Sequence, residues 1–298
     1  MLAEALVHEF MHTKLGGLMH LFTMTDGPGS PCLYAPWRDD PRPASGLLQG
    51  IYAFFGIADF WRRERSWQGD PLAEYEYAKA RAQTVEALGT AQGDGNLTDT
   101  GRLFAQRIAD EVHAWPDDLA EETRYLLRLA TDGHRAGWRI RHRRPDPATV
   151  VRLARAWEAG ATGPLALGPF EVLPDPQTRV WSTGRLGLGR WRIAAPDRFA
   201  QARQTDWGGA LTEADLALYA GDTKTATIGF LTQIDRDPGA VDAWTGLGLA
   251  LGSDRMAPAR AAAALLERPE VVLAVYRQIR SNHSPVDLAA WIGSQLDN

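Results

Sequence analysis

The segment that most restricts how this chain can fold begins at Leu2 and reads LAEALVHEFMHTKLGGLMHLF. Its apolar residues recur at helical spacing and no proline interrupts it, so it predicts a helix. His8 and His12 are four residues apart and therefore lie on one face of that helix, about one turn from each other. Two imidazoles at this spacing can chelate one metal ion, and Glu9 is placed to reach a water molecule on that ion. The H-E-x-x-H pattern therefore predicts a metal site on the first helix.

A metal site of this kind needs a third protein ligand that leaves coordination positions open. His20 is one candidate, because Gly16 and Gly17 weaken the helix and could bend it back toward the metal. If the helix continues through both glycines, His20 lies about 12 Å along the axis from His12, too far to share the ion. We favour that second interpretation, in which His20 is a helix-end residue.

Residues 44–65 predict a second helix, with an apolar stripe of Leu48, Ile51, Tyr52, Phe55, Ala58 and Trp61. Gln49 is a polar residue in this helix, and it either supplies an oxygen ligand to the metal or bonds a neighbouring backbone group. The preceding segment APWRDDPRP must be a loop, and in it Arg38 and Arg42 flank two aspartates. These arginines either form a local salt-bridged loop or hold a carboxylate beside the metal site.

The segments LVHEFMHTKLGGLMHL and YAPWRDDPRPASGLLQGIYAFFGIADFWR resemble the H-E-x-x-H motif proteins found beside ribosomally made, post-translationally modified peptides in bacteria. The resemblance is dense over residues 6–65 and looser over the remainder. Family members with an assigned activity look like mononuclear non-haem iron enzymes that use 2-oxoglutarate and O₂ to hydroxylate a β-carbon. The resemblance implies an oxidoreductase with Fe(II) and 2-oxoglutarate as cofactors and a precursor peptide as its partner.

The resemblance also implies roles for single residues. It makes His8 and His12 metal ligands, and it places Gln49 where relatives often have histidine. It suggests an aspartate where this chain has His20, so the third ligand stays open among Gln49, His20 and an aspartate. Arg38 and Arg42 are the candidates for binding the far carboxylate of 2-oxoglutarate.

Two other functions fit the same residues. In a zinc metallopeptidase, Glu9 would be the general base that takes a proton from water. In a non-catalytic peptide-binding helical protein, the H-E-x-x-H motif would be vestigial. Under the hydroxylase interpretation Glu9 ligates, positions water or guides a substrate proton.

The remainder of the chain predicts a mainly α protein. We expect a helical metal-binding catalytic region over residues 1–160, a linker over residues 161–210 and a tetratricopeptide-like helical region over residues 211–298. The last region either packs as structure or holds the leader of the precursor peptide. Val180, Trp181, Trp191 and Ile193, with glycines between them, predict either a small β hairpin in the linker or an irregular connection.

Composition excludes several classes of partner. The formal net charge is −5 and no basic tract is present, which argues against nucleic acid. Cys32 is the only cysteine, so no intrachain disulfide can form and a reducing cytoplasm is permitted. The first residues lack the pattern of a signal peptide, and no apolar run approaches ~18 residues, so we expect a cytoplasmic protein without a membrane span.

The metal-binding helix begins very close to Met1, where helix ends fray. Ligands must be held within a fraction of an ångström. We therefore expect Leu2 and Leu6 to be buried in the working protein. The cover would be the helices after residue 44, a second copy of the chain in a homodimer, or a partner protein.

Overall fold

The structure, a computed structural model, describes residues 2–27, 29, 32–173, 183–202, 211–279 and 283–296. The described residues are mainly helical, which confirms the predicted fold class. The chain divides into two compact units, the first comprising Met1–Thr131 with Pro176–Trp181 and the second Asp132–Asp175 with Ser182–Asn298. The division falls inside α5 (Glu121–His142), earlier than the end of the catalytic region that we expected at residue 160.

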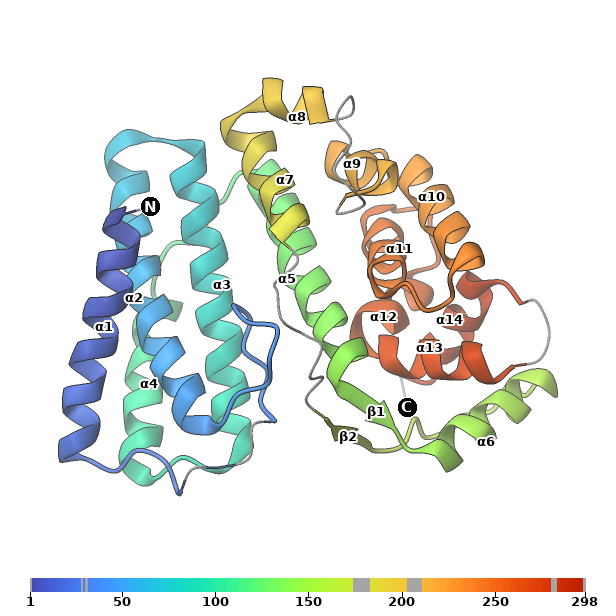
Figure 1. Ribbon diagram of the computed structural model, residues 1–298, viewed down its shortest axis with the longest axis horizontal. Helices are drawn as coiled ribbons and strands as arrows, with labels where there is room; N and C mark the ends of the chain where they lie inside the picture. The colour runs from blue at the N-terminus through green and yellow to red at the C-terminus, as the bar shows by residue number, and fades with distance from the viewer. Residues whose placement is uncertain are drawn as a thin grey trace. The chain divides into compact units, whose positions relative to one another are not determined.

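Helices that lie side by side form the first unit (Figure 1). They are α1 (Leu2–Leu21), α2 (Ala44–Gln68), α3 (Pro71–Asp94) and α4 (Asp99–His113), followed by the first half of α5. The long central helix α2 packs against α1, α3 and α4. The predicted helices at the start of the chain and after residue 44 are therefore both present.

Local sequence signals begin and end the helices of this unit. Asp70 caps α3 by accepting a hydrogen bond from the backbone N–H of Leu72, and Pro71 occupies the first helical position. Thr98 caps α4 in the same way. Gly69 and Gly95 follow α2 and α3 with positive φ values of 62° and 78°, which end those helices in the left-handed region.

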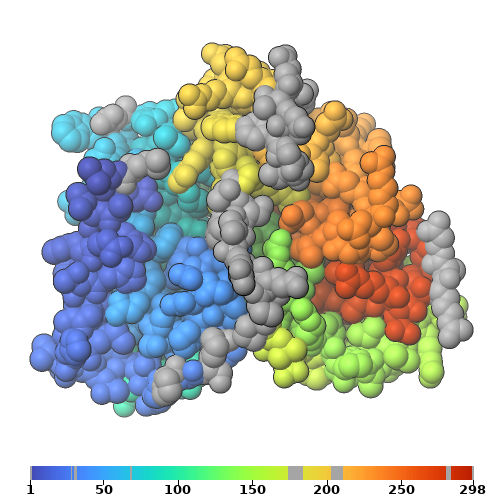
Figure 2. Space-filling model, in the orientation of Figure 1, coloured from blue at the N-terminus to red at the C-terminus, as the bar shows by residue number. Residues whose placement is uncertain are grey.

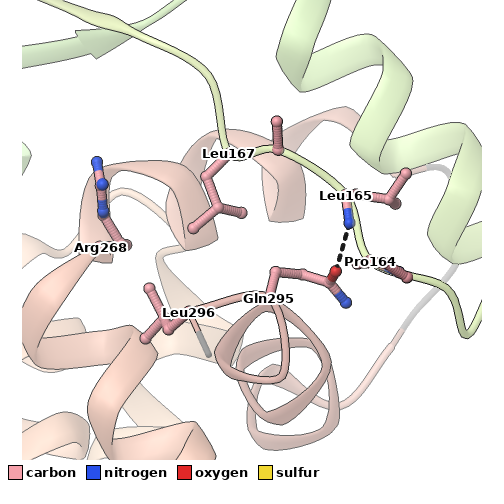
Figure 3. A pocket seen from close by; sticks show the side chains of 7 residues that line it. Pro164, Leu165, Leu167, Arg268, Gln295 and Leu296 are labelled. Carbon is pink, nitrogen blue, oxygen red and sulfur yellow. Dashed lines mark hydrogen bonds between the residues drawn. The ribbon is translucent and has the colours of Figure 1, made fainter. Parts of the chain in front are cut away.

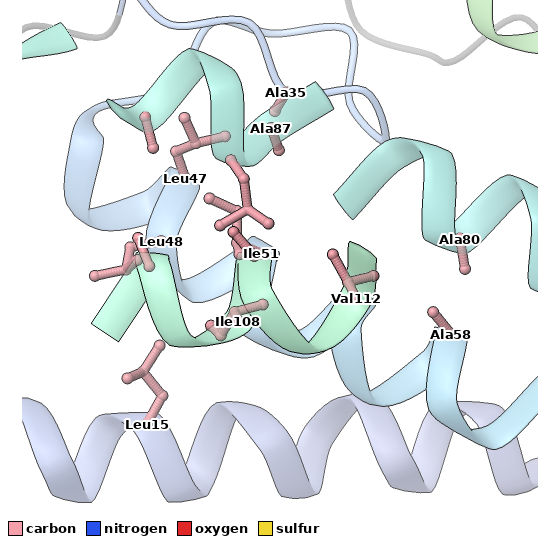
Figure 4. Close-up of a cluster of buried hydrophobic side chains, with 14 of the residues drawn as sticks. Leu15, Ala35, Leu47, Leu48, Ile51, Ala58, Ala80, Ala87, Ile108 and Val112 are labelled. Atoms are coloured by element: carbon pink, nitrogen blue, oxygen red, sulfur yellow. The ribbon is translucent and has the colours of Figure 1, made fainter. Parts of the chain in front are cut away.

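The core of the first unit lies around α2. Figure 4 shows its apolar side chains, which include Leu15 of α1, Leu47, Leu48 and Ile51 of α2, and Ile108 and Val112 of α4. On α1, only Met11 and Leu15 are buried among the described residues. Met11 sits directly on Gly56, where an added Cβ would lie 2.5 Å from the Met11 Cγ, so the glycine lets α1 approach α2 closely.

The C-terminal end of α1 is fastened to the loop between α3 and α4. The backbone N–H of Asp26 donates to the carbonyl of Asn96 at 2.9 Å, and that of Thr98 donates to the carbonyl of Met24 at 3.1 Å. The Thr98 hydroxyl donates to the carbonyl of Thr23 at 2.7 Å. A side chain at position 101 would collide with the Met24 carbonyl, which explains the glycine there.

The N-terminal end of α1 is not covered by the chain itself. Leu2 is 77% exposed, Leu6 63% and Phe10 62%, and α1 (dark blue) forms an open outer surface of the first unit (Figure 2). Burial of Leu2 and Leu6 by the helices after residue 44 is therefore wrong. The reason is that α1 turns Met11 and Leu15, on its other face, toward α2. Cover by a second copy or a partner protein stays a prediction.

The second unit contains the only paired strands of the described residues. Strand β1 (Arg143–Pro145) pairs antiparallel with β2 (Phe170–Val172). The described helices of this unit, besides the second half of α5, are α6 (Pro147–Glu158), α7 (Thr183–Ala194), α8 (Pro196–Ala202), α9 (Glu213–Ala220), α10 (Thr223–Arg236), α11 (Val241–Ser253), α12 (Ala259–Glu267), α13 (Pro269–Gln278) and α14 (Pro285–Gly293). In the described ranges of both units, no helix combines the length and apolar character needed to cross a bilayer.

The predicted hairpin is wrong where it can be compared. Trp191 and Ile193 lie in helix α7, and Val180 and Trp181 lie outside the described residues. Tertiary contacts hold this glycine-rich segment in a helix that its low helix propensity disfavours. Leu188 is fully buried, and Arg185 donates to Asp215 of α9 at 2.7 Å.

Helix α11 is the centre of the second unit. It packs against α9, α10, α12 and α13, and nine of its residues are buried. Its glycines lie against neighbouring side chains: an added Cβ at Gly246 would be 2.4 Å from the Phe230 ring, and one at Gly248 would be 2.9 Å from Leu265. The helical pairs expected after residue 211 are present, and their tetratricopeptide character stays a prediction.

Candidate metal centre

The two histidines of the H-E-x-x-H pattern face each other on α1. Their Nε2 atoms are 3.0 Å apart, and the ring centroids are 4.6 Å apart with the planes at 77°. Two nitrogens that each bind one ion at about 2.0–2.1 Å, at an angle near 90°, are separated by about 3 Å. His8 and His12 therefore have the spacing of two adjacent ligands of a single ion.

Gln49 reaches this site from α2. Its Oε1 accepts a hydrogen bond from Nδ1 of His12 at 3.1 Å, and its Nε2 donates to the sulfur of Met19 at 3.3 Å. A ring nitrogen that donates to an oxygen fixes the tautomer and leaves the other nitrogen free for a metal. Gln49 is thus placed to orient His12, with both of its polar atoms already engaged.

The other two residues of α1 that were considered do not join the histidine pair. Glu9 is exposed, and so is His20. Helix α1 continues through Gly16 and Gly17 to Leu21, which is the arrangement that keeps His20 about 12 Å along the axis from His12. Within the part of the chain that the structure describes, no three side chains of the His, Cys, Asp and Glu types gather as a metal-holding group.

The surroundings of His8 favour its neutral form. Partial burial lowers the pKa of this imidazole, and the nearby His12 lowers it further, while Glu9 and Glu4 act in the opposite direction. The neutral imidazole is the form that binds a metal ion, because its lone pair is available.

An aromatic wall connects His8 to the loop after α1. The Phe54 ring meets His8 edge to face at 6.0 Å and stacks on Trp37 at 4.4 Å. Trp37 lies on Gly50, where an added Cβ would be 2.3 Å from the indole ring. Sequence reasoning missed this wall; the available signal was the pair Gly46 and Gly50, four residues apart on one face of α2.

The loop that contains Arg38 and Arg42 leads into helix α2, and the guanidinium groups of both arginines bind the Asp40 carboxylate. Arg38 contacts Asp40 at 2.7 Å, and Arg42 contacts it at 3.3 Å. Partial burial raises the pKa of the Asp40 carboxyl, but the hydrogen bond and charge of Arg38 and the hydrogen bond of Arg42 outweigh it and hold that pKa below its ordinary value. The side chain of Arg42 rests on Gly46, one turn before Gly50.

Comparison with models of known protein families finds no match for this chain, and neither characterised proteins nor solved structures provide one. The chemistry of the site therefore has to be understood from its own geometry.

Proposed function

We propose that the protein is an iron- and 2-oxoglutarate-dependent hydroxylase that acts on the β-carbon of a residue in a ribosomally made precursor peptide. The observation that carries the proposal is the pair of Nε2 atoms 3.0 Å apart, with His12 oriented by Gln49. Two imidazole nitrogens suit iron as well as zinc, and a small protein ligand set leaves coordination positions for a co-substrate.

In this proposal each residue has a defined task. His8 and His12 hold the ion, and Gln49 keeps His12 in the tautomer that presents Nε2. Fe(II), with 2-oxoglutarate and O₂, would supply the oxidising chemistry. Phe54 and Trp37 provide an apolar surface beside His8 that limits the access of water.

Arg42 and Arg38 are the proposed partners of the far carboxylate of 2-oxoglutarate. Arg42 uses Nη1 for Asp40, while its Nε and Nη2 lie over Gly46. Arg38 uses Nε for Asp40. Each guanidinium therefore has nitrogens beyond the one that Asp40 engages, and a planar guanidinium can bind a second carboxylate through them.

A zinc metallopeptidase is the alternative built on the same two histidines. It requires Glu9 to act as general base on a water molecule at the metal. Glu9 is exposed on α1, and the turnover test below separates the two functions.

The test is turnover under defined conditions. The protein is loaded anaerobically with Fe(II), then given 2-oxoglutarate, O₂ and the precursor peptide encoded beside its gene. We expect a peptide product heavier by one oxygen atom, together with succinate, by mass spectrometry. Peptide fragments formed without 2-oxoglutarate would establish the peptidase, and no metal uptake would leave a peptide-binding protein.

The arginine loop provides a second test of the same proposal. Replacing Arg42 or Arg38 by alanine should raise the 2-oxoglutarate requirement about 10- to 150-fold for the residue that binds the carboxylate. Arg63→Ala is a matched control, because Arg63 is an exposed arginine of α2 that pairs with Asp59. Normal 2-oxoglutarate binding in both loop variants would show that Arg38 and Arg42 only stabilise the loop and do not bind the co-substrate.

A further inference from the structure

The second unit contains a cavity of about 350 Å³ that the proposed chemistry does not use. Figure 3 shows its lining, which consists of Pro164, Leu165, Ala166, Leu167, Arg268, Gln295 and Leu296. Five of its seven lining residues, three leucines, a proline and an alanine, have apolar side chains. Arg268 and Gln295 are its only polar side chains.

The side-chain amide of Gln295 forms hydrogen bonds within the wall of the cavity. Its Oε1 accepts a hydrogen bond from the backbone N–H of Leu165 at 2.7 Å, as Figure 3 shows. Its Nε2 donates to the hydroxyl of Ser294 and to the carbonyl of Trp291. Since both ends of this buried amide are engaged, the side chain fixes the segment at Leu165 to the end of α14 and has little left for a ligand.

Arg268 differs from Gln295 because no acidic side chain of the described residues pairs with it. Glu270, two residues further along the chain, is taken by Arg139, which contacts it through two nitrogens at 3.0 and 2.5 Å. Arg143 adds a further positive charge: it lies 4.0 Å over the Phe170 ring and its Nε is buried. The charges of Arg139, Glu270 and Arg268 all act on Arg143.

The positive charges of Arg139 and Arg268 act unfavourably on Arg143. The pKa of Arg143 is lowered to about 10, mainly by burial and then by the charge of Arg139, with a smaller lowering from Arg268 and with Glu270 acting in the opposite direction. A ligand that brought a negative charge to Arg268 would relieve this repulsion.

We propose that the cavity binds a carboxylate attached to a branched apolar group, with the carboxylate on Arg268 and the apolar group among Leu165, Leu167 and Leu296. One planar guanidinium matches a carboxylate through two parallel hydrogen bonds. The volume is at the lower end for ligand pockets, so it fits the end of a peptide or a small aliphatic acid.

Binding is measured by isothermal titration calorimetry on the full chain without added metal, with three probes. They are N-acetyl-leucyl-leucine with a free carboxylate, the same peptide with an amidated end, and 4-methylpentanoate. We expect the free acid to bind saturably and the amide to bind about 10- to 150-fold more weakly, since it lacks the charge-assisted pair. Binding of the peptide acid alone would identify a peptide end as the ligand, and equal binding of 4-methylpentanoate would identify a small acid.

Variants test the site independently of the ligand change. Arg268→Gln should weaken the free acid by the same factor and leave the amide unaffected. Arg255→Gln is the control, an exposed arginine before α12 in the same unit. Equal binding of acid and amide, unchanged affinity of Arg268→Gln, or no saturable binding of either acid would overturn the proposal. Because no metal or 2-oxoglutarate is present, none of these results depends on the proposed hydroxylase.

Discussion

Helices α1 and α11 differ in how much of each helix is buried against the rest of the chain. Helix α1 spans 20 residues with only Met11 and Leu15 buried, whereas α11 spans 13 residues with nine buried. The glycines of α11 are pressed against Phe230 and Leu265, while Gly16 and Gly17 of α1 have nothing within 4 Å of an added Cβ. The helix with the candidate chemistry is thus lightly held, and a helix without it is a centre of packing. The candidate metal ligands and the most deeply buried helix therefore lie in different units of the chain.

The sharpest test of this contrast removes the histidines. His8→Ala or His12→Ala should abolish metal binding, because one remaining imidazole cannot chelate the ion, yet the melting temperature should change little because neither side chain is in the core. Metal content after Fe(II) loading and thermal unfolding are the two measurements. His20→Ala is the matched control, an exposed histidine on the same helix. Wild-type metal content in either the His8 or the His12 variant would show that these two histidines do not form a metal site.

Hydrogen exchange should separate the two helices next. Backbone amides of residues 241–251 in α11 should exchange only through global unfolding, whereas those of residues 5–9 in α1 should exchange through local opening, since few buried contacts hold them. Mass-spectrometric exchange on the isolated chain measures both. If residues 5–9 become protected as protein concentration rises, a second copy covers Leu2 and Leu6. Protection at the lowest concentration would contradict a lightly held α1.

Gln49 allows a smaller and more selective change. Gln49→Leu should weaken metal binding about 10- to 100-fold, because it removes the acceptor that orients His12, and Gln49→Glu should preserve most of the affinity. Competition with a metal-binding dye gives the affinities. Complete loss of metal in Gln49→Leu would instead make Gln49 a ligand.

Single methyl groups give the smallest expected effects, of opposite sign in the two helices. Gly246→Ala should destabilise the protein by about 1–3 kcal/mol, because the new Cβ collides with the Phe230 ring. Gly17→Ala should stabilise it by about 0.5–1 kcal/mol, because the methyl enters open space and alanine favours helix. Denaturant unfolding measures both free energies. The same sign in both variants would mean that the packing difference has been misjudged.

The sequence allowed the helices to be predicted where the apolar periodicity was clear, as in α1 and α2. It also allowed the pairing of His8 with His12, because a four-residue spacing on one helix needs no tertiary information. The role of Gln49 depends on the register of α2 against α1, which Met11 and Gly56 determine by contact. The segment of α7 was misjudged because its partner residues, such as Asp215, lie far along the chain.

The segment that follows α1 is hydrogen-bonded to the loop between α3 and α4, so distances along α1 can be measured from this attachment. At a rise of about 1.5 Å per residue, His12 lies about 16 Å and His8 about 22 Å from the attachment at Thr23 and Met24. Rocking of the helix about that attachment would move His8 about a third farther than His12, yet one rigid helix would preserve their mutual spacing. Rocking therefore changes how His8 meets Phe54 much more than how the two imidazoles meet each other.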